Sequence, residues 1–431
     1  MAASASAPAA ADVHPDWADD PRLDGLEVYR VGGAIRDRLL GLAGADSDFV
    51  VVGAAPETLA ERGFRPVGRD FPVFLHPDSG AEFALARTER KSGAGYAGFT
   101  FHTGPDVSLD DDLRRRDLTI NAIAEDRDGR LVDPFGGKHD LERRTLRHVS
   151  PAFAEDPVRL LRLARFATRF PAFEIAPETA ALARRLVDSG EVDHLVPERV
   201  WQEMSRALMH ARPSRFVRLL REFGALERLL PELDRLFGVL QVARWHPEID
   251  AGDHVMRVLD VAAADERALP VRFAALVHDL GKGITPADEL PSHPGHETTG
   301  LPLVEAVCER LRVPSACREL GLLVCEHHLN VHRAATLRPA TLVRLLRRVD
   351  AWRRPERFEQ FLQACQADRQ GRKGRVASPV PEIDLMRRAA RITAAVDGRA
   401  LAARGLRGAE LGAAIERERA ARVRRLLGRS P

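Results

Sequence analysis

The first third of the chain alternates short apolar runs of strand type with short helical runs. Strand-like runs such as Val28–Val31 and Phe49–Val52 are separated by a helical segment, Ala34–Leu42. A turn sequence that begins at Asp126 and contains Gly129 predicts a hairpin near the end of this region. The pattern predicts an α+β domain over residues 25–149, with a mixed or antiparallel sheet and helices. Its other expected elements are Pro56–Arg62, Val73–His76 and Glu82–Arg87.

From Glu155 onward the apolar positions follow a helical period and continue to do so. They recur every three or four residues in four successive segments, Glu155–Phe170, Pro177–Ser189, Pro197–His210 and Pro213–Phe223. We therefore predict an all-helical region over 150–240 and a second helical domain over 241–372, which holds most of the histidines. Residues 373–431 are expected to form a helical tail that begins with a linker, Lys373–Pro381.

Composition limits the possible functions. The 431 residues are 45% hydrophobic and 30% charged, with a formal net charge of only +2. Clustered arginines on a near-neutral chain indicate a local surface for a polyanion. Four scattered cysteines without Cys-x-x-Cys spacing favour reduced thiols in a cytoplasmic protein, and no apolar run is long enough to span a membrane. Residues 1–24 lack the features of a signal peptide, and we expect a disordered extension there.

The run Asp46-Ser47-Asp48 leads directly into an apolar strand and carries the first candidate chemistry. Because side chains alternate on a strand, Asp46 and Asp48 point the same way and repel unless a cation lies between them. The Gly32-Gly33 turn just upstream suits close approach of a phosphate at a helix start. A lone Asp-x-Asp is common in solvated turns, but beside this turn it predicts a Mg²⁺ site for nucleotidyl transfer.

Two further segments fit the same site. The basic run Arg87–Gly93 is typical of a loop that closes over a nucleotide, although an ordinary exposed loop is an equal alternative. Arg114–Asp117 is expected to open a helix, where Arg116 could bind phosphate and Asp117 could accept from ribose hydroxyls. A capped helix start with solvated arginines is the other interpretation.

A stripe of charged residues follows Pro157, which suits a first helical turn. Its members recur every three residues and are Asp156, Arg159, Arg162 and Arg165. The stripe lacks interspersed glutamates, which favours a polyanion partner over an ordinary solvated face. One carboxylate acceptor and one guanidinium donor also match the edge that cytosine and adenine share and that uracil and guanine lack. Asp156 and Arg159 could therefore select nucleotides without a template.

The segment from Val31 to about Phe170 resembles the bacterial class II tRNA nucleotidyltransferases, the CCA-adding enzymes. The matching motifs are Val31-Gly32-Gly33-Ala34-Ile35-Arg36-Asp37, Asp46-Ser47-Asp48, Arg115-Arg116-Asp117 and Glu155-Asp156-Pro157-Val158-Arg159. The resemblance implies a catalytic head, a nucleotide-selecting neck, and a helical body and tail that clamp the tRNA acceptor stem. Poly(A) polymerases of bacteria resemble the same head and neck.

The resemblance also implies roles for single residues. It implies triphosphate contacts from Gly33 and Arg36, Mg²⁺ ligation by Asp46 and Asp48, phosphate and ribose contacts from Arg116 and Asp117, base reading by Asp156 and Arg159, and support of the nucleotide by Arg162 and Arg165. Glu82 is a possible third carboxylate of the metal site. The implied ligands are ATP, CTP and the 3′ end of tRNA, bound by a monomer or a homodimer.

A second constellation lies in the histidine-rich region, where His278-Asp279-Leu280-Gly281-Lys282 ends an apolar helix. Imidazole and carboxylate groups suit a transition metal, although any single histidine is more often structural. The motif resembles the HD phosphohydrolase superfamily, which implies a metal site of His254, His278, Asp279 and Asp368, with His296 and His328 as further ligands. Lys282 could contact phosphate. The resemblance implies a divalent transition metal, with Ni²⁺ as one candidate.

An HD domain after this head is typical of a multifunctional subgroup of CCA-adding enzymes and weighs against poly(A) polymerase. We therefore expect an enzyme that adds C, C and A to tRNA 3′ ends from CTP and ATP and releases pyrophosphate. The HD domain is expected to add 2′,3′-cyclic phosphodiesterase, 2′-nucleotidase and phosphatase activity. Two alternatives remain open, a poly(A) polymerase with the same head and a catalytically inactive RNA-binding protein.

Overall fold

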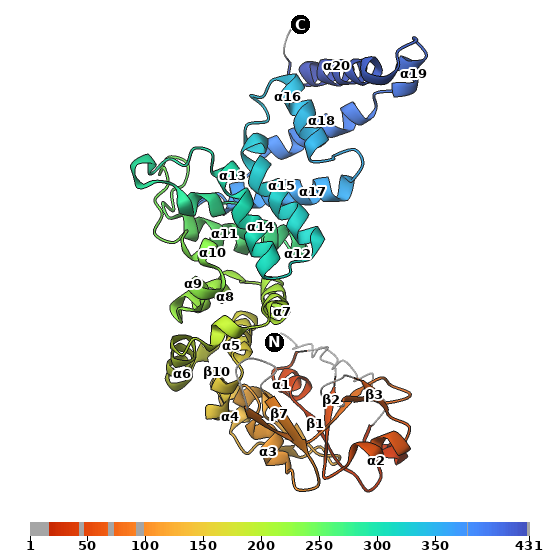
Figure 1. Ribbon diagram of the computed structural model, residues 1–431, viewed down its shortest axis with the longest axis vertical. Helices are drawn as coiled ribbons and strands as arrows, with labels where there is room; N and C mark the ends of the chain where they lie inside the picture. Colours follow the sequence, from red (N-terminus) through yellow and green to blue (C-terminus); the bar gives the residue numbers. More distant parts are fainter. Residues whose placement is uncertain (1–16, 43–46, 68–72, 92–98, 377, 429–431) are drawn as a thin grey trace, which may run out of the picture. The chain divides into compact units, whose positions relative to one another are not determined.

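The computed structural model describes residues 17–42, 47–67, 73–91, 99–376 and 378–428. The chain divides into two compact units, Met1–Val196 and Pro197–Pro431, which we call the N-terminal and C-terminal units (Figure 1). The N-terminal unit combines a mixed sheet with helices, and the described part of the C-terminal unit is helical. This confirms the predicted α+β head and helical remainder.

The N-terminal unit is built on a seven-stranded sheet. From one edge to the other its strands are β3 (Arg65–Val67), β4 (Val73–Leu75), β5 (Glu82–Leu85), β2 (Asp48–Val52), β1 (Glu27–Val31), β8 (Ala124–Glu125) and β9 (Leu131–Val132). Only the β2–β5 pair is parallel among these neighbours. The β8–β9 pair is the hairpin predicted from the turn at Asp126–Gly129.

Strand β2 separates two apolar cores because its side chains alternate between the faces of the sheet. Phe49 and Val51 pack on one face with Leu59 of α2 (Pro56–Glu61). Val50 packs on the other face with Leu113 of α3 (Leu109–Arg114). Asp48 belongs to the same face as Val50 and is exposed at the start of the strand. The alternation therefore buries the strand while leaving one carboxylate at its edge.

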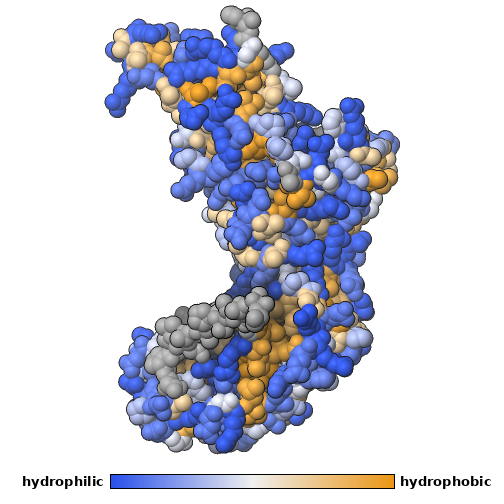
Figure 2. Space-filling view, turned by 180° about the vertical axis from the view of Figure 1, so that it is seen from behind, coloured by the Kyte–Doolittle hydropathy of each residue, from blue (hydrophilic) through white to orange (hydrophobic). Residues whose placement is uncertain are grey.

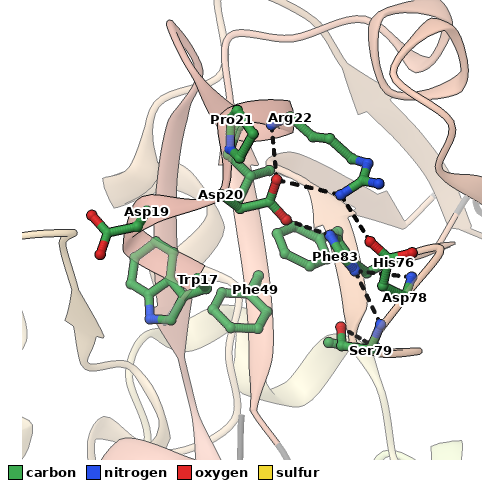
Figure 3. Close-up of a pocket in the computed structure, with 12 residues that line it drawn as sticks. Trp17, Asp19, Asp20, Pro21, Arg22, Phe49, His76, Asp78, Ser79 and Phe83 are labelled. Carbon is green, nitrogen blue, oxygen red and sulfur yellow. Dashed lines mark hydrogen bonds and ion pairs between the residues drawn. The ribbon is translucent and has the colours of Figure 1, made fainter. Parts of the chain in front are cut away.

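The face opposite Asp48 is covered by the start of the described chain. Trp17 and Leu23, in two short 3-10 turns, are buried in the core around Phe49 (Figure 3). Our expectation of disorder over residues 1–24 is therefore wrong for residues 17–24. A pocket of about 290 Å³ lies between these turns and the sheet, and Asp20 contacts His76 at its polar edge. This pocket lies across the sheet from Asp48.

The remaining elements of the N-terminal unit surround the sheet. They are α1 (Gly33–Leu39), the antiparallel pair β6 (Arg87–Lys91) and β7 (Phe99–Thr103), α4 (Gly137–Glu142), the parallel pair β10 (Thr145–Leu146) and β11 (Glu174–Ile175), α5 (Val158–Arg169) and α6 (Pro177–Asp188).

Two local predictions in this unit are wrong. Arg87–Lys91 is strand β6 rather than a loop, and residues 92–98 lie outside the described part of the chain. The segment Arg114–Asp117 ends α3 instead of opening a helix. The true start is marked by Ser108, whose side chain caps the helix in a reciprocal capping box with Asp111.

The C-terminal unit consists of helices packed around one large core and a smaller one. Its helices are α7 (Pro197–Leu208), α8 (Ser214–Glu222), α9 (Ala225–Leu229), α10 (Pro231–Asp234), α11 (Ala251–Ala264), α12 (Leu269–Val277), α13 (His296–Thr299), α14 (Leu301–Arg310), α15 (Ser315–His332), α16 (Pro339–Arg348), α17 (Pro355–Gly371), α18 (Pro381–Ala394), α19 (Gly398–Ala402) and α20 (Gly408–Leu426). The described part of the predicted helical tail over 373–431 contains α18, α19 and α20.

The surface of the C-terminal unit is mainly hydrophilic on the face shown in Figure 2, with smaller apolar areas between the charged residues. Among the described residues, none of the helices combines the length and the hydropathy needed to cross a bilayer.

Candidate active sites

The sheet register places Asp48 beside the glycine turn. Asp48 is paired with Val31 of β1, the residue directly before Gly32, on one side. On the other side it is paired with Glu82 of the parallel strand β5, and both carboxylates are exposed. Paired residues of neighbouring strands share a face, so two carboxylates lie next to a turn that opens a helix. Oxygen ligands of this kind suit Mg²⁺. Asp46 lies outside the described residues.

Two arginines flank the glycine turn. Gly32 precedes α1 with a φ of +74°, a conformation that favours glycine. A Cβ built on Gly32 would lie 3.1 Å from Nη1 of Arg116, and one on Gly33 would lie 3.5 Å from Nη2 of Arg36. The backbone N–H groups of the first turn of α1 and two guanidinium groups therefore lie close together. This arrangement suits a polyphosphate.

The predicted nucleotide residues are linked by a buried network. Arg36 donates to Asp37 at 2.8 Å and to the side chain of Asn121 at 2.6 Å. Asn121 donates in turn to Asp117 at 2.9 Å, and Arg162 of α5 donates to the other oxygen of Asp117 at 2.7 Å. The network joins three parts of the unit: α1, the segment that follows α3, and α5. It therefore holds the five side chains just named in one arrangement.

The Asp117 carboxyl group is 5% exposed and receives charged and neutral donors. Burial alone would raise its pKa, but Arg162 and the hydrogen bonds from Asn121, Arg162 and the amide of Leu118 outweigh burial. The pKa of Asp117 therefore lies well below its ordinary value. In this arrangement Asp117 orders Arg162, in addition to any contact it makes with ribose.

Helix α5 places an aromatic ring among the arginines of the predicted stripe. The guanidinium carbons of Arg36, Arg162 and Arg165 lie 5.1, 5.6 and 4.4 Å from the ring centre of Phe166. The distances suit cation–π contacts, which keep the planar guanidinium groups in place. The stripe's carboxylate partners come from the sheet side of the unit, as the Asp117–Arg162 pair shows. Sequence spacing within α5 could not reveal them.

Asp156 and Arg159 lie at the start of α5. An oxygen of Asp156 accepts from the amide of Val158 at 3.1 Å, and Arg159 is buried and donates to the carbonyl oxygen of Ala152 at 2.7 Å. The first amide of α5 thus positions Asp156, and the chain before the helix positions Arg159. Asn121, Asp37 and Phe166 are residues of this site that sequence reasoning did not single out.

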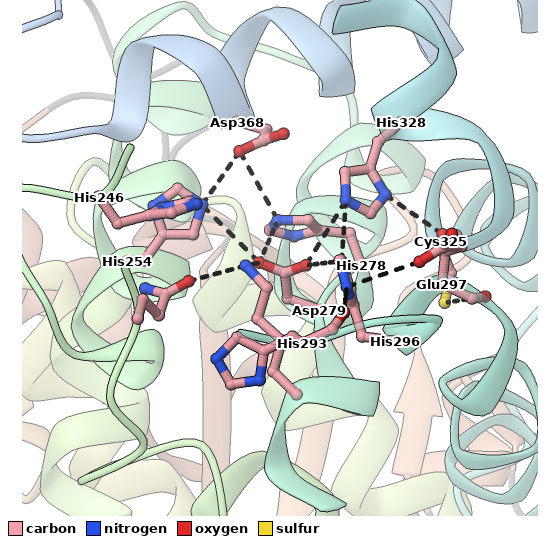
Figure 4. Close-up of polar contacts among 12 residues, drawn as sticks. His246, His254, His278, Asp279, His293, His296, Glu297, Cys325, His328 and Asp368 are labelled. Atoms are coloured by element: carbon pink, nitrogen blue, oxygen red, sulfur yellow. Dashed lines mark hydrogen bonds and ion pairs between the residues drawn. The ribbon is translucent and has the colours of Figure 1, made fainter. Parts of the chain in front are cut away.

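The second site lies inside the C-terminal unit. The structure brings together all six residues predicted as HD-site ligands, which come from α11, the end of α12, α13, α15 and α17 and are His254, His278, Asp279, His296, His328 and Asp368 (Figure 4). All six are at most 5% exposed. Asp279 lies at the centre, with its oxygens 3.2 Å from His278 Nε2, 3.3 Å from His296 Nε2 and 3.6 Å from His328 Nε2.

The imidazole groups are oriented for a cation. Nδ1 of His278, His296 and His328 lies 2.8–2.9 Å from a backbone carbonyl oxygen, so each ring donates there and directs the lone pair of Nε2 inward. Nε2 of His296 and Nε2 of His328 face each other at 3.5 Å. Nε2 of His278 and Oδ1 of Asp279 are buried without a hydrogen-bond partner among the described residues. Facing lone pairs and orphaned acceptors fit one or more divalent metal ions.

Charge and burial favour the metal-binding protonation state at three of the ligands. At His278, burial alone would lower the pKa, but Asp279 and Asp368 outweigh burial and raise it. Burial lowers the pKa of His328 to about 3, so this imidazole is neutral near pH 7. Burial alone would raise the pKa of Asp279, but His278 and Lys282 outweigh it and hold the pKa well below its ordinary value. The pKa of Asp368 is lowered in the same way, chiefly by His332. Neutral imidazole and ionised carboxylate are the metal-binding forms.

Gly281 explains the fixed spacing of the His278–Lys282 motif. A Cβ at this position would overlap the carbonyl oxygen of His296, so only glycine lets the motif pack against α13. The close approach brings Asp279 to His296. Lys282 also belongs to the site, since its Nζ donates to Asp279 at 2.6 Å and to Gln241 at 2.7 Å.

Three supporting residues were not among the predicted ligands. An oxygen of Glu248 lies 2.8 Å from Nδ1 of His254 and 3.1 Å from Nδ1 of His246. His332 contacts Asp368 through Nε2. A carboxylate behind a ligand histidine fixes the ring and raises its basicity. His332 lies four residues after His328, and this helical spacing was the available signal.

Comparison with known families gives matches along most of the chain. Residues 28–147 match the poly A polymerase head domain, residues 172–237 match a probable RNA- and SrmB-binding site of polymerase A, and residues 251–354 match the HD domain. A protein named multifunctional CCA protein from Ralstonia nicotianae is 60% identical over 391 residues, which are 89% of this chain and 91% of the relative. One of the same name from Alkalilimnicola ehrlichii is 57% identical over 396 residues, 91% of this chain and 96% of the relative.

Solved structures share the fold. The Thermotoga maritima CCA-adding enzyme complexed with tRNA has a TM-score of 0.62 and 19% identity, covering 94% of this chain and 88% of its own. The Bacillus stearothermophilus CCA-adding enzyme in complex with CTP has a TM-score of 0.60 and 24% identity, covering 94% and 90%.

Proposed function

Because this chain belongs to the family of multifunctional CCA proteins, we propose that it adds C, C and A to the 3′ end of tRNA from CTP and ATP. The tRNA 3′-hydroxyl attacks the α-phosphate in line, a new phosphodiester bond forms and pyrophosphate leaves. The observation that carries the proposal for the site is the register that sets Asp48 directly beside the Gly32-Gly33 turn.

Different residues of the N-terminal unit bind the metal, the triphosphate and the base. Asp48, with Asp46 and with Glu82 as a third carboxylate, would hold Mg²⁺, which supplies charge neutralisation at the phosphates and a lower pKa of the attacking hydroxyl. The turn at Gly33, with Arg36 and Arg116, binds the triphosphate and orients it. Asp156 and Arg159 offer one acceptor and one donor to the base edge, which suits cytosine and adenine.

The α5 side of the site fixes how the nucleotide lies. Arg162 and Arg165 are held by Asp117 and by the ring of Phe166, so their charges are in place before the nucleotide binds. Pre-positioned donors reduce the cost of ordering the site during the reaction.

The HD centre is a second, chemically separate activity. We assign to it the hydrolysis of 2′,3′-cyclic phosphodiesters, 2′-nucleotides and other phosphomonoesters. His254, His278, Asp279 and Asp368, with His296 and His328, would hold a divalent transition metal such as Ni²⁺, which supplies a Lewis acid and an activated water. Lys282 donates to Asp279, and its positive charge would neutralise the phosphoryl oxygens of a bound substrate.

The cellular setting follows from the same proposal. All four cysteines are buried free thiols, which fits a reducing cytoplasm, where tRNA substrates and nucleoside triphosphates are present.

The test feeds single nucleotides to the enzyme. A tRNA lacking its 3′ end is incubated with labelled CTP, ATP or both, and product lengths are read on a gel. We expect two C and one A, and at least about a 10³-fold loss of rate for Asp48→Asn and for Asp46→Ala, with tRNA affinity nearly unchanged.

The control variant is Asp128→Asn, which changes an exposed aspartate in the β8–β9 turn and should keep full activity. Long tracts made from ATP alone would identify a poly(A) polymerase. A wild-type protein that binds tRNA but incorporates nothing would identify an RNA-binding protein without this activity.

A further inference from the structure

A pocket of about 560 Å³ opens beside the HD centre. Its lining includes His296 and His332, which contact the metal-site carboxylates Asp279 and Asp368. The pocket is therefore continuous with the buried histidines, and its volume is within the range of small-molecule sites. Lys282 and His332 of the lining also hold the metal-site carboxylates, whereas Trp245 and Arg372 have no part in holding them.

The charge of the lining is one-sided. Four basic side chains line the pocket, Lys282, Arg333, Arg369 and Arg372, and no carboxylate does so among the described residues. Burial lowers the pKa of Arg369, and repulsion from the neighbouring Arg372 lowers it further, so these cations crowd one another. Lys282 is paired with Asp279 behind the lining, but crowded cations in a lining without carboxylates favour an anion.

Two buried donors in the lining have no acceptor. Arg372 is 7% exposed and its Nε has no hydrogen-bond partner among the described residues. Gln241 is 3% exposed, and while its Oε1 accepts from Lys282, its Nε2 is also without a partner. A buried donor left unpaired costs roughly 1–3 kcal/mol, so unpaired donors in a pocket indicate acceptor atoms supplied by a ligand.

An aromatic side chain lies in the same lining. The side chain belongs to Trp245, which is 54% exposed. The guanidinium of Arg244 lies 4.9 Å from its ring centre and supports it. An exposed indole beside cationic groups is the usual combination for a nucleobase next to its phosphate.

We propose that this pocket is the nucleotide subsite of the HD centre, in which Arg372 and Gln241 bind phosphate oxygens and Trp245 stacks on the base. The proposal rests on the assigned phosphohydrolase function and adds to it the residues that select the substrate. It implies that the centre prefers nucleoside phosphates, including the terminal nucleotide of an RNA, over phosphoesters without a base.

The test measures binding without turnover. Full-length protein freed of metal with a chelator is titrated by calorimetry with inorganic phosphate and with adenosine 2′-monophosphate. We expect both to bind the wild type, the nucleotide more tightly. Arg372→Gln should raise the dissociation constants of both ligands about tenfold or more, since hydrogen bonds to charged groups are the strong ones.

Trp245→Ala should affect the affinities for the two ligands differently. We expect about a 5- to 50-fold weaker affinity for the nucleotide, an unchanged affinity for inorganic phosphate, and recovery of most nucleotide affinity in Trp245→Phe. Gln241→Glu keeps the size of the side chain and the oxygen that accepts from Lys282, but it replaces the unpaired donor with a negative charge. Gln241→Glu should raise the dissociation constants of both ligands at least tenfold, and it provides a second test if Arg372→Gln fails to fold.

The matched control is Arg391→Gln, which removes an exposed arginine of α18 outside the pocket. A nucleotide held by the N-terminal unit adds the same background to every variant. Three outcomes would overturn the proposal. They are that neither ligand binds the wild type, that Arg372→Gln and Arg391→Gln bind the ligands with equal affinity, or that Trp245→Ala loses the same factor of affinity for phosphate and for the nucleotide. Loss of hydrolysis in the metal-loaded protein with intact binding would instead count against the phosphohydrolase assignment alone.

Discussion

Asp48 of the N-terminal unit is exposed at the start of a strand, whereas Asp279 of the C-terminal unit is 1% exposed and lies among four histidines and a lysine. The first site takes its shape from backbone, a glycine turn and the register of three strands. The second takes its shape from side chains that contact one another inside a helical core.

The two sites also differ in the kind of ligand that completes them. At the glycine turn, backbone N–H groups and two arginines converge on a position that a large, mobile substrate must reach. In the HD centre the backbone carbonyls already fix the imidazoles, so only a small ion is needed to complete the cluster. An open site suits a polymer end and a triphosphate, and a buried one suits a stable metal centre with an adjoining pocket.

The largest expected effect comes from Asp279→Asn, which removes the charge shared by the histidines and Lys282. Hydrolysis of adenosine 2′,3′-cyclic phosphate should fall by at least about 10³-fold, and bound metal measured by mass spectrometry should fall with it. CCA addition should stay within about twofold, because the head site shares no residue with this centre.

The control for this change is Asp253→Asn, an exposed aspartate of α11 that pairs with Arg218 at the surface. It should keep both activities and its metal. A large loss of CCA addition in Asp279→Asn would show that the two sites are not independent.

Gly32→Ala tests whether the head site depends on backbone. Gly32 and Gly25 have φ of +74° and +73°, so alanine should strain both by about 1 kcal/mol or more, and Gly32 more strongly because its ψ of −126° lies outside the left-handed helical region. At Gly25 the new Cβ meets nothing within 4 Å, but at Gly32 it displaces Nη1 of Arg116. We expect a loss of stability in both variants, larger in Gly32→Ala, and about a 10- to 100-fold loss of nucleotide incorporation for Gly32→Ala only.

The readout is incorporation of CTP at saturating tRNA, compared with the urea midpoint of each variant. Equal incorporation by the two variants would mean that Arg116 and the turn do not position the nucleotide.

The sequence reveals the local motifs of both sites better than it reveals the distant residues that contact them in the fold. The Gly32-Gly33 turn and the strand after Asp48 follow from glycine conformation and from alternation, and the six HD residues follow from the resemblance to the HD phosphohydrolase superfamily. Their assembly depends on contacts over long sequence distances, such as those of Asp368 with His254, which local spacing does not contain.

The errors have physical causes. The run of three arginines before Asp117 suggested a helix start, but the capping box at Ser108 and Asp111 decides where α3 begins. Composition suggested disorder up to residue 24, but two apolar side chains, Trp17 and Leu23, pack into a core that only the folded sheet provides. The pairing of Asp48 with Glu82 depends on a parallel register that β5 acquires in the fold.

The smallest expected effect tests whether the buried carboxylate of the nucleotidyltransferase site is structural as well as functional. Asp117→Asn removes the charge that Arg162 contacts, and we expect the N-terminal unit to lose about 1–2 kcal/mol of stability at pH 7. Hydrogen exchange of its peptides in urea measures this loss.

The same variant tests the pH dependence of this stabilisation. The pKa of Asp117 is lower in the folded state than the value of about 3.9 in an unfolded chain. Its stabilisation is therefore complete above about pH 4 and is lost as the pH falls toward the folded-state pKa. The difference between wild type and Asp117→Asn should narrow below pH 4, while Asp78→Asn, an exposed control, should show no such difference at any pH. A stability equal to that of the wild type at pH 7 would leave Asp117 only a role in contacting the nucleotide, and the head site would then be less preassembled than its network of hydrogen bonds indicates.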